Sequence, residues 1–369
     1  MHPAILQIGT GRLLQAHADL MIDEALAAGE AAGPVIAVTT SGTPEAARRA
    51  QALAYGAGFP IHIRGLVHGE PVDRQIQVTS VIKALDAVTH WDDVRAEAVD
   101  PRIRAWISNT ADRGYELHDE DHAGTPVPRS FPGKLLKLLQ ARFEEGGAPL
   151  SVFPLELVTD NGKVLRRIVS QLAGRWGASD GFLAWLDNEV VFADSLVDRI
   201  VSEPIEPVGA VAEPYALWAI RDMPGLFVPL KHRDLVVTPD LERYARLKLF
   251  ILNLGHTWLA ERWLIEGRPA DETVLQTLQD VDMLASLDRV YDDEVLPVFV
   301  AIGLGEEAEE YRRTTMERFS NPYLRHRLAD IAQNHQAKKE RRFGGLIALS
   351  REHAPHHPTP LLDAALAGG

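Results

Sequence analysis

The sequence contains no cysteine among its 369 residues. Disulfide bonds, thiolate nucleophiles and zinc or iron–sulfur sites built on cysteine are therefore excluded. The chain also has no H-E-x-x-H motif, a common zinc-binding signature. Chemistry at an active site must use oxygen and nitrogen side chains, and we predict no metal site.

Basic residues are scarce relative to acidic ones, with 38 Lys and Arg against 52 Asp and Glu, a net charge of -14 and a pI near 5.5. Nucleic acid and anionic membranes are disfavoured as partners because they require a concentrated positive field. No stretch offers the roughly 20 uninterrupted apolar residues of a membrane span, and the start, MHPAILQIGTGRLLQAHADL, shows no basic leader before an apolar core. We expect a cytoplasmic protein with a small-molecule partner.

The length allows two hydrophobic cores, with 46% hydrophobic residues to fill them. Apolar strands are predicted in residues 4–8, 34–40 and 102–110, with a fourth in the segment 150–162 that runs towards Asp160 and Asn161. They alternate with amphipathic helical segments such as 133–143 and 162–176. This alternation predicts an α/β domain with a mostly parallel sheet, over residues 1–237.

The pattern changes at Thr238, Pro239 and Asp240, which provide a hydroxyl N-cap, a proline at the first helical position and an acid in the first turn. The segments after them have helical periodicity, and we expect no strand beyond about residue 237. The sequence predicts a second, all-helical domain over residues 238–369.

The turn after the first strand reads GTGRLLQA, with Gly9 and Gly11 followed by Arg12 and Leu13 at the start of a helix. Such a turn lets the backbone approach a pyrophosphate, which the helix N-terminus attracts. It departs from the usual G-x-G-x-x-G spacing, and glycines at a strand–helix turn often serve the turn alone. Dinucleotide binding through these residues is therefore a hypothesis.

The choice between NAD and NADP stays open in the sequence. An acid usually follows the second strand to bind the ribose hydroxyls of NAD, but here that strand ends in Val-Thr-Thr-Ser at residues 38–41. Arg48 and Arg49, on the next helix, could meet a 2′-phosphate, although an arginine pair on a helix is more often a solvated face. Asn109 and Thr110, at the end of a strand, lie where open α/β sheets bind ligands, so we expect them near the nicotinamide half.

The stretch KLFILNLGH places Lys248, Asn253 and His256 in an apolar segment. On an α-helix they project at roughly 0°, 140° and 80°, on one side of the axis. Taken without context, structural roles are the favoured explanation of these residues.

Seven blocks in order resemble the mannitol dehydrogenase family of polyol-specific long-chain dehydrogenases: IGTGRLLQAHAD, SNTADRGYE, FPGKLLKLLQARF, PLELVTDNGKVLRRIV, SLVDRIVSEP, KLFILNLGHT and RFSNPYLRHRLADIA. The similarity runs nearly end to end. It looks closest to the branch of tagaturonate reductases, also called altronate oxidoreductases.

The resemblance implies a metal-independent oxidoreductase that uses NAD, with NADP not excluded. Lys248 would be the general base, Asn253 would stabilise the alkoxide oxygen, and His256 would hold the same oxygen or a neighbouring hydroxyl. A lysine serves as a base near neutral pH only if burial or a nearby charge lowers its pKa.

The implied substrate is a sugar acid such as tagaturonate, since the chain reads Leu155-Glu156-Leu157 where mannitol 2-dehydrogenases carry a second amide donor. Candidate substrate ligands are Asn161, Arg325 and Lys338, although surface charges on a helix explain the last two equally well. The alternatives are a neutral polyol or a polyol phosphate as substrate, and a dinucleotide-binding protein that has lost catalysis.

Overall fold

The computed structural model describes residues 2–54, 56–110 and 114–368. The chain forms two compact units. The N-terminal unit comprises Met1–Ile63 and Arg74–Leu241, and the helical unit comprises Arg64–Asp73 and Glu242–Gly369. This division falls four residues beyond the boundary expected after residue 237, and it assigns a ten-residue internal segment to the second unit.

A six-stranded parallel sheet organises the N-terminal unit, in the order β5-β2-β1-β6-β7-β8. Its strands are β1 (Ile5–Ile8), β2 (Val35–Thr39), β5 (Val81–Asp86), β6 (Ala105–Ser108), β7 (Leu150–Pro154) and β8 (Val190–Phe192). All residues of β1, β2, β6 and β7 are buried, as expected for strands covered on both faces. The strand order is that of a Rossmann fold, with its topological switch point between β1 and β6. The predicted α/β class is confirmed.

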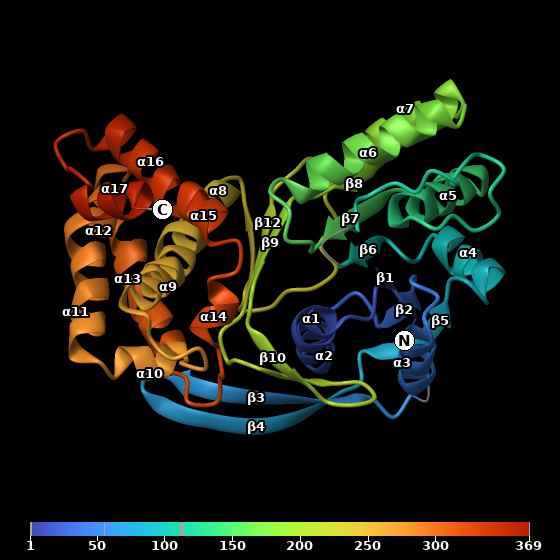
Figure 1. Ribbon diagram of the computed structural model, residues 1–369. Coiled ribbons are helices and arrows are strands. Elements are labelled where there is room, and N and C mark those ends of the chain that lie inside the picture. The colour runs from blue at the N-terminus through green and yellow to red at the C-terminus, as the bar shows by residue number, and fades with distance from the viewer. Residues whose placement is uncertain (1, 55, 111–113, 369) are drawn as a thin grey trace. The chain divides into compact units, whose positions relative to one another are not determined.

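Helices pack against this sheet (Figure 1). The first helical stretch runs through α1 (Arg12–Leu14), η1 (Gln15–Asp19) and α2 (Leu20–Ala27). The others are α3 (Pro44–Ala54), α4 (Trp91–Val99), α5 (Phe131–Glu144), α6 (Asn161–Arg175) and α7 (Asp180–Asn188). Ser130 caps α5, because its hydroxyl accepts a hydrogen bond from the Gly133 amide at 3.2 Å.

Two smaller sheets were not predicted. One has the order β10-β11-β3-β4, and the other has the order β13-β12-β9. Their strands are β3 (Phe59–Val67), β4 (Glu70–Val78), β9 (Ser195–Asp198), β10 (Val201–Pro204), β11 (Ala210–Ala212), β12 (Leu217–Arg221) and β13 (Leu235–Thr238). Strand β3 passes from the N-terminal unit into the helical unit after Ile63. The first domain is thus more than a parallel sheet with helices.

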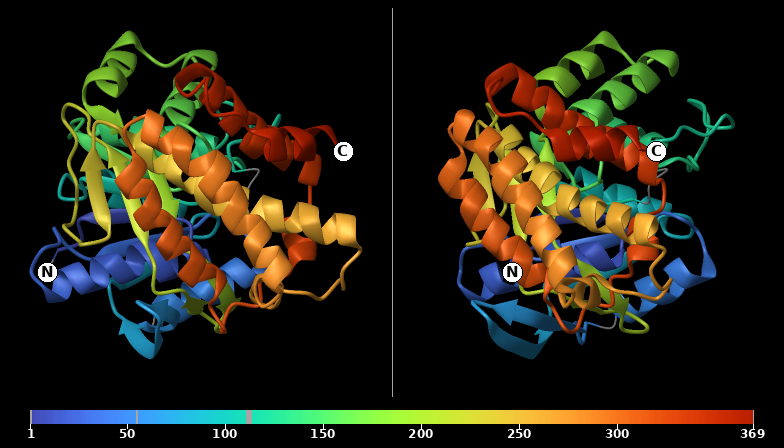
Figure 2. Two further views of the ribbon diagram at one scale, coloured as in Figure 1. Left: turned by 90° about the vertical axis from the view of Figure 1, so that its left-hand side faces the viewer. Right: turned by 60° about the vertical axis from the view of Figure 1, so that its left-hand side comes forward.

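The helical unit begins with α8 (Leu241–Leu247), η2 (Lys248–Asn253) and α9 (Leu254–Glu266). It continues with α10 (Val274–Leu278), α11 (Val281–Val290), η3 (Tyr291–Val295), α12 (Leu296–Ala301), α13 (Gly305–Phe319), α14 (Leu328–Ile331), α15 (His335–Lys339), η4 (Glu340–Gly344), α16 (Gly345–His353) and α17 (Pro360–Ala367). In the described part of this segment no strand follows Thr238, in agreement with the prediction. Helices α9 and α11 pack together, and α13 packs on η2 (Figures 1 and 2).

The hairpin tip from Arg64 to Asp73 belongs to the helical unit through hydrogen bonds with α13 and the loop after it. Glu317 accepts from the Gly69 amide at 2.6 Å, and the Asn321 carboxamide donates to the Arg64 carbonyl at 3.2 Å. The Arg64 guanidinium also stacks on the Tyr323 ring at 4.3 Å. Within the described residues, no helix combines the length and apolar character that a membrane crossing requires.

Candidate active site

The glycine turn after β1 has the geometry expected of a phosphate-binding turn. Gly9 adopts φ +124°, and a Cβ at this position would lie 2.6 Å from the Asn109 carbonyl oxygen. Gly11 precedes the helix as its N-cap without a capping side chain, and its Cβ would find its nearest atom only at 4.0 Å. The turn therefore needs glycine at position 9 for its backbone, and the open space at Gly11 leaves the helix amides accessible to an anion.

The two residues after the turn have different surroundings. Arg12 forms an exposed ion pair with Glu206, with 2.8 Å between Nη2 and Oε1. Leu13 lines a cavity of about 410 Å³ together with Asn109 and Thr110. The remaining lining residues are Gly114, Tyr115, Glu156, Leu157 and Val158. The SNTADRGYE block continues through residues 111–113, which lie outside the described residues.

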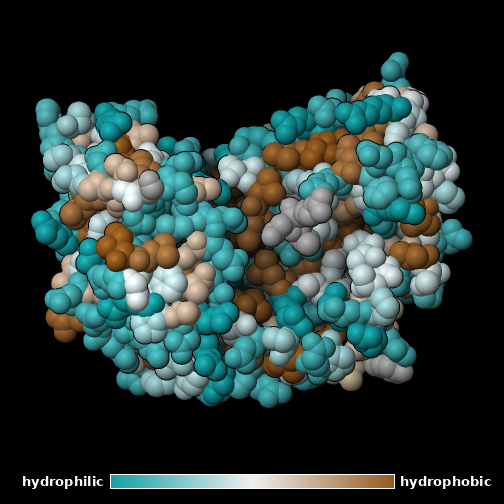
Figure 3. All heavy atoms as spheres, viewed as in Figure 1, coloured by the Kyte–Doolittle hydropathy of each residue, from teal (hydrophilic) through white to brown (hydrophobic). Residues whose placement is uncertain are grey.

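This cavity lies at the carboxyl ends of β6 and β7, beside the switch point of the sheet. Leu157 and Val158 keep 74% and 36% of their surface exposed, giving the cavity an apolar wall. Figure 3 shows brown, hydrophobic surface on the N-terminal unit. The cavity thus combines an apolar wall with the polar groups of Asn109 and Thr110, which suits the face of a planar ring.

Glu156 is the polar centre of this cavity, and sequence reasoning noted it only as a departure from a motif. Its carboxylate accepts from the Thr110 amide at 3.0 Å, from the Ser108 hydroxyl at 3.1 Å and from the Tyr115 hydroxyl at 3.2 Å. Burial raises the pKa of Glu156, while these hydrogen bonds oppose the shift. Its position directly after β7, at the ligand-binding edge of the sheet, was the available signal.

Asn161 was a candidate substrate ligand, and its carboxamide is fully engaged within the protein. Nδ2 donates to the carbonyls of Glu156 at 3.0 Å and Ser195 at 2.8 Å. Oδ1 accepts from the amides of Gly162 and Ser195, each at 2.9 Å. Because the side chain is 1% exposed and all four hydrogen-bonding positions are used, it has no group left for a substrate. Its role here is to join the start of α6 to β9.

The end of β2 carries Thr39, which pairs in register with Asp86 of the neighbouring strand β5. The Asp86 carboxylate accepts from the Val88 amide at 2.7 Å. Arg49 pairs with Glu45 on α3, and Arg48 is exposed.

The KLFILNLGH segment forms η2 and the start of α9. Lys248 and Asn253 are half-buried and are the first and last residues of η2, a π-helical segment. In a π-helix the N–H of residue i+5 bonds to the carbonyl of residue i, so residues five apart become neighbours along the axis. The separation of roughly 140° calculated for an α-helix therefore does not apply to Lys248 and Asn253. The actual backbone brings their positions closer in angle.

Gly255 within the same segment permits a close contact with Tyr291 from η3. A Cβ at Gly255 would overlap the Tyr291 hydroxyl, which donates to the Ile251 carbonyl at 2.9 Å. The Tyr291 side chain is completely buried. The Tyr291 hydroxyl of η3 thus holds the backbone of η2 in place.

His256 is 6% exposed and lies between two rings. Its ring centroid is 4.3 Å from that of Phe319 and 4.7 Å from that of His326. Burial lowers the pKa of His326; the charge of Asp330 opposes this shift, and the charge of Lys338 adds to it. The helical unit therefore keeps His326 neutral near pH 7.

Arg342 of η4 reaches the end of η2, and the sequence analysis did not single it out. Its Nη1 donates to the Asn253 carbonyl at 3.0 Å and to the Thr257 hydroxyl at 2.5 Å. The Thr257 hydroxyl donates to the same Asn253 carbonyl at 3.0 Å. Burial lowers the pKa of Arg342 to about 10, so the guanidinium stays charged at neutral pH.

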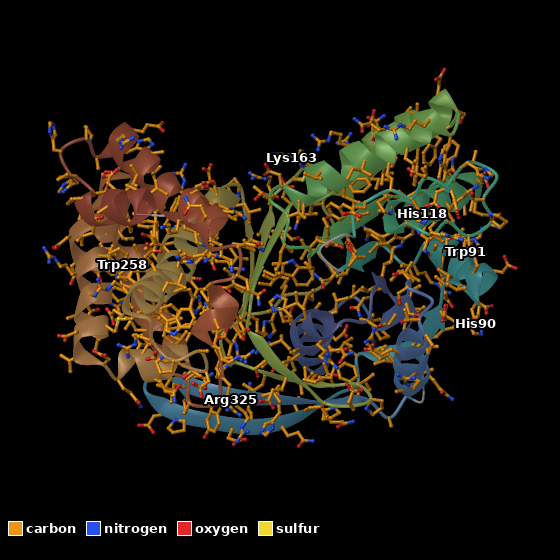
Figure 4. All side chains as sticks on the ribbon, viewed as in Figure 1. His90, Trp91, His118, Lys163, Trp258 and Arg325 are labelled. Atoms are coloured by element: carbon orange, nitrogen blue, oxygen red, sulfur yellow. The ribbon has the colours of Figure 1, made fainter. Side chains whose placement is uncertain are left out.

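The two remaining candidates for substrate binding differ in burial. Lys338 of α15 is half-buried, and its ammonium donates to the Ile331 carbonyl at 2.7 Å. Burial, followed by the charge of Arg342, lowers its pKa. Arg325 is exposed and lies at the lower end of the helical unit in Figure 4, away from the label of Trp258 on α9. Lys338 is therefore a better placed cation than Arg325 for a desolvated ligand.

No group of three or more His, Asp or Glu side chains in the described ranges is arranged to hold a metal ion. The expectation of metal-independent chemistry stays a prediction.

Comparisons with known proteins cover both units. The family model described as the mannitol dehydrogenase Rossmann domain matches residues 3–226, and that of the mannitol dehydrogenase C-terminal domain matches residues 240–363. The altronate oxidoreductase of Halalkalibacterium halodurans is 31% identical over 351 residues, which cover 89% of this chain and 67% of the relative. That of Yersinia enterocolitica is 30% identical over 393 residues, covering 99% and 79%.

Two solved structures share the fold. A substrate-free D-sorbitol dehydrogenase matches with a TM-score of 0.86 at 20% identity, covering 100% of this chain and 80% of the other. The Pseudomonas fluorescens mannitol 2-dehydrogenase, a ternary complex with NAD and D-mannitol, matches with a TM-score of 0.74 at 22% identity, covering 100% and 79%. The chain therefore belongs to the mannitol dehydrogenase family and is an oxidoreductase acting on CH–OH groups.

Proposed function

We propose that this protein transfers a hydride between NAD and the secondary alcohol or ketone carbon of a sugar acid, interconverting an aldonate such as altronate with its keto-uronate. The observation that carries the proposal is the placement of Lys248 and Asn253 at the two ends of one π-helical segment, followed by His256 in the first turn of α9. The altronate oxidoreductases, with about 30% identity over most of the chain, support the substrate class.

The residues of the N-terminal unit fit a dinucleotide. The turn with Gly9 and Gly11 would hold the pyrophosphate at uncapped helix amides, and Asn109 and Thr110 would face the nicotinamide half. When bound, the coenzyme supplies a hydride acceptor or donor. Arg12 and Leu13 would flank the coenzyme. For this, Arg12 would either give up its ion pair with Glu206 or contact Glu206 and the coenzyme together.

The residues of the helical unit supply proton transfer and charge stabilisation. Lys248 removes the hydroxyl proton in alcohol oxidation and returns it in ketone reduction, as a general base and acid. Asn253 donates its amide N–H to the oxygen that becomes negatively charged. His256 positions the same oxygen or the neighbouring hydroxyl. Rigid packing of η2 and α9 maintains this arrangement, because Tyr291 and Arg342 bond to the backbone of the segment.

A neutral polyol or polyol phosphate is the competing substrate class, and one experiment separates it from a sugar acid. The purified protein is mixed with NADH or NADPH and with tagaturonate, fructuronate, fructose or a ketose phosphate, and the nicotinamide absorbance is followed. Oxidation restricted to a keto-uronate would establish the proposal and identify the coenzyme. Reaction of neutral ketoses alone would overturn the sugar-acid assignment, and no reaction at all would favour a protein that has lost catalysis. The cytoplasmic location stays a prediction from the sequence.

A further inference from the structure

Two half-buried cations on consecutive turns of one helical stretch have no acidic partner. Lys338 and Arg342 are four residues apart, and neither forms an ion pair with any carboxylate in the described parts of the chain. Like charges at this spacing repel, and partial burial increases the cost because water is removed. In a chain with a net charge of -14, acidic residues were available to neutralise them.

The neighbouring Lys339 shows what a structural cation in this helix looks like. It is 2% exposed, and its ammonium lies 3.0 Å from the Glu261 carboxylate and 2.7 Å from the Ala365 carbonyl. Glu261 also pairs with His335 at 2.7 Å. The buried cation Lys339 therefore has an acidic partner, whereas Lys338 and Arg342 have none among the described residues.

The guanidinium of Arg342 is held so that one of its edges stays unused. Its Nη1 bonds to the Asn253 carbonyl and the Thr257 hydroxyl, whereas Nε and Nη2 have no partner in the described structure. The Nε–Nη2 edge presents two parallel N–H groups, which match the two oxygens of a carboxylate. Because Nη1 is anchored, little freedom is lost when that edge binds an anion.

We propose that Arg342 is a specificity-determining residue that binds the substrate carboxylate together with Lys338, and that it couples carboxylate binding to the position of Asn253. This inference rests on the proposed function, since it names the groups that recognise the acid end of the same substrate. A carboxylate between the two cations removes their mutual repulsion. The same guanidinium bonds to the Asn253 carbonyl, so an acidic substrate would stiffen the end of η2 when it binds.

The test measures the affinity of altronate for the full-length enzyme saturated with NADH, by calorimetry, because altronate and NADH cannot react with each other; kcat and KM for tagaturonate are measured alongside. Arg342→Gln should weaken altronate binding by about 10- to 100-fold, the loss expected for charge-assisted hydrogen bonds, and should leave the affinity for NADH unchanged. Arg341→Gln is the matched control, because Arg341 is the exposed neighbouring guanidinium, and it should bind altronate like the wild type.

Altronate affinity within twofold of wild type in Arg342→Gln would overturn the inference, even if kcat falls, because a scaffold role alone lowers turnover without changing binding. If Arg342→Gln does not fold, Arg342→Lys is measured instead. Lysine keeps the positive charge but lacks the two parallel N–H groups of Nε and Nη2. Wild-type altronate affinity in Arg342→Lys would equally overturn the inference. Failure of the wild type to bind or convert any sugar acid would instead refute the proposed function, so the two failures are distinguishable.

Discussion

Lys248 and Asn253 are the first and last residues of a single π-helical segment. The i+5 backbone bonding of such a segment places residues five apart next to each other, which an α-helix does not do. In the proposed roles, Lys248 takes the proton and Asn253 binds the oxygen of one O–H group, so both side chains must reach the same group. The π-helical backbone thus brings the positions of Lys248 and Asn253 closer in angle than an α-helix would.

Replacing Lys248 tests the base directly. Lys248→Ala should lower kcat by about 10³-fold or more, because alanine cannot accept the proton, while NADH affinity is preserved. Stopped-flow absorbance gives kcat, and nicotinamide fluorescence gives the dissociation constant. Lys231→Ala, at an exposed lysine of the N-terminal unit, is the control with wild-type rates. Turnover of Lys248→Ala within tenfold of wild type would show that the base lies elsewhere.

The two glycines of the phosphate turn should respond differently to alanine. Gly9→Ala should destabilise the protein, because a Cβ meets the Asn109 carbonyl at 2.6 Å and φ is +124°. Gly11→Ala should fold normally, since its Cβ has room, and should weaken NADH binding by crowding the pyrophosphate. Thermal unfolding and NADH titration of both variants check this. Unchanged NADH affinity in Gly11→Ala would argue against a pyrophosphate at this turn.

Asn161 should contribute to stability rather than to substrate affinity. Asn161→Ala removes four hydrogen bonds in a buried place and should cost about 3 kcal/mol or more, without a specific rise in KM. The control is Lys163, which lies two residues further along α6 and has an exposed side chain (Figure 4). Lys163→Ala should change the free energy of unfolding by less than about 1 kcal/mol. A folded Asn161→Ala variant with normal stability and a much higher KM would restore the substrate-binding role.

Asp19 should make stability depend on pH. Complete burial raises the pKa of Asp19 to about 8, from 3.8 in the unfolded chain. Between these values the folded state keeps a proton that the unfolded state has released, so stability falls as the pH rises from 3.8 to about 8. Asp19→Asn should remove this dependence and unfold at a higher temperature than wild type at pH 8, with little difference near pH 4. Exposed Asp187→Asn is the control, and identical pH profiles for Asp19→Asn and wild type would contradict the prediction.

The parallel sheet could be predicted because its strands are short runs of apolar residues between glycine turns and helices. The hairpin of β3 and β4 could not, although β3 alternates buried and half-buried residues over most of its length. Its two-residue turn uses His68 and Gly69, both with positive φ, and histidine is an unusual residue for the first position. The turn therefore lacks the Asn-Gly or Asp-Gly signal by which hairpins are recognised.

The catalytic candidates Lys248, Asn253 and His256 could be named because the sequence resembles the mannitol dehydrogenase family, whereas the segment alone is explained by structural roles. Tyr291 and Arg342 could not, since they come from helices 40 to 90 residues further along and act on backbone carbonyls. Periodicity within one helix contains no information about such partners. For the same reason the π-helical backbone was not predictable, and neither was the use of all four hydrogen-bonding positions of Asn161.

The hairpin tip from Arg64 to Asp73 also limits how this enzyme can be divided or recombined. The chain crosses between its two units after Ile63, after Asp73 and after Leu241. A fragment that ends at Leu241 would keep the tip but lose Glu317 and Asn321, its hydrogen-bond partners. A chimaera that takes its substrate half from a relative must therefore receive residues 64–73 along with residues 242–369, as two inserts from the same parent.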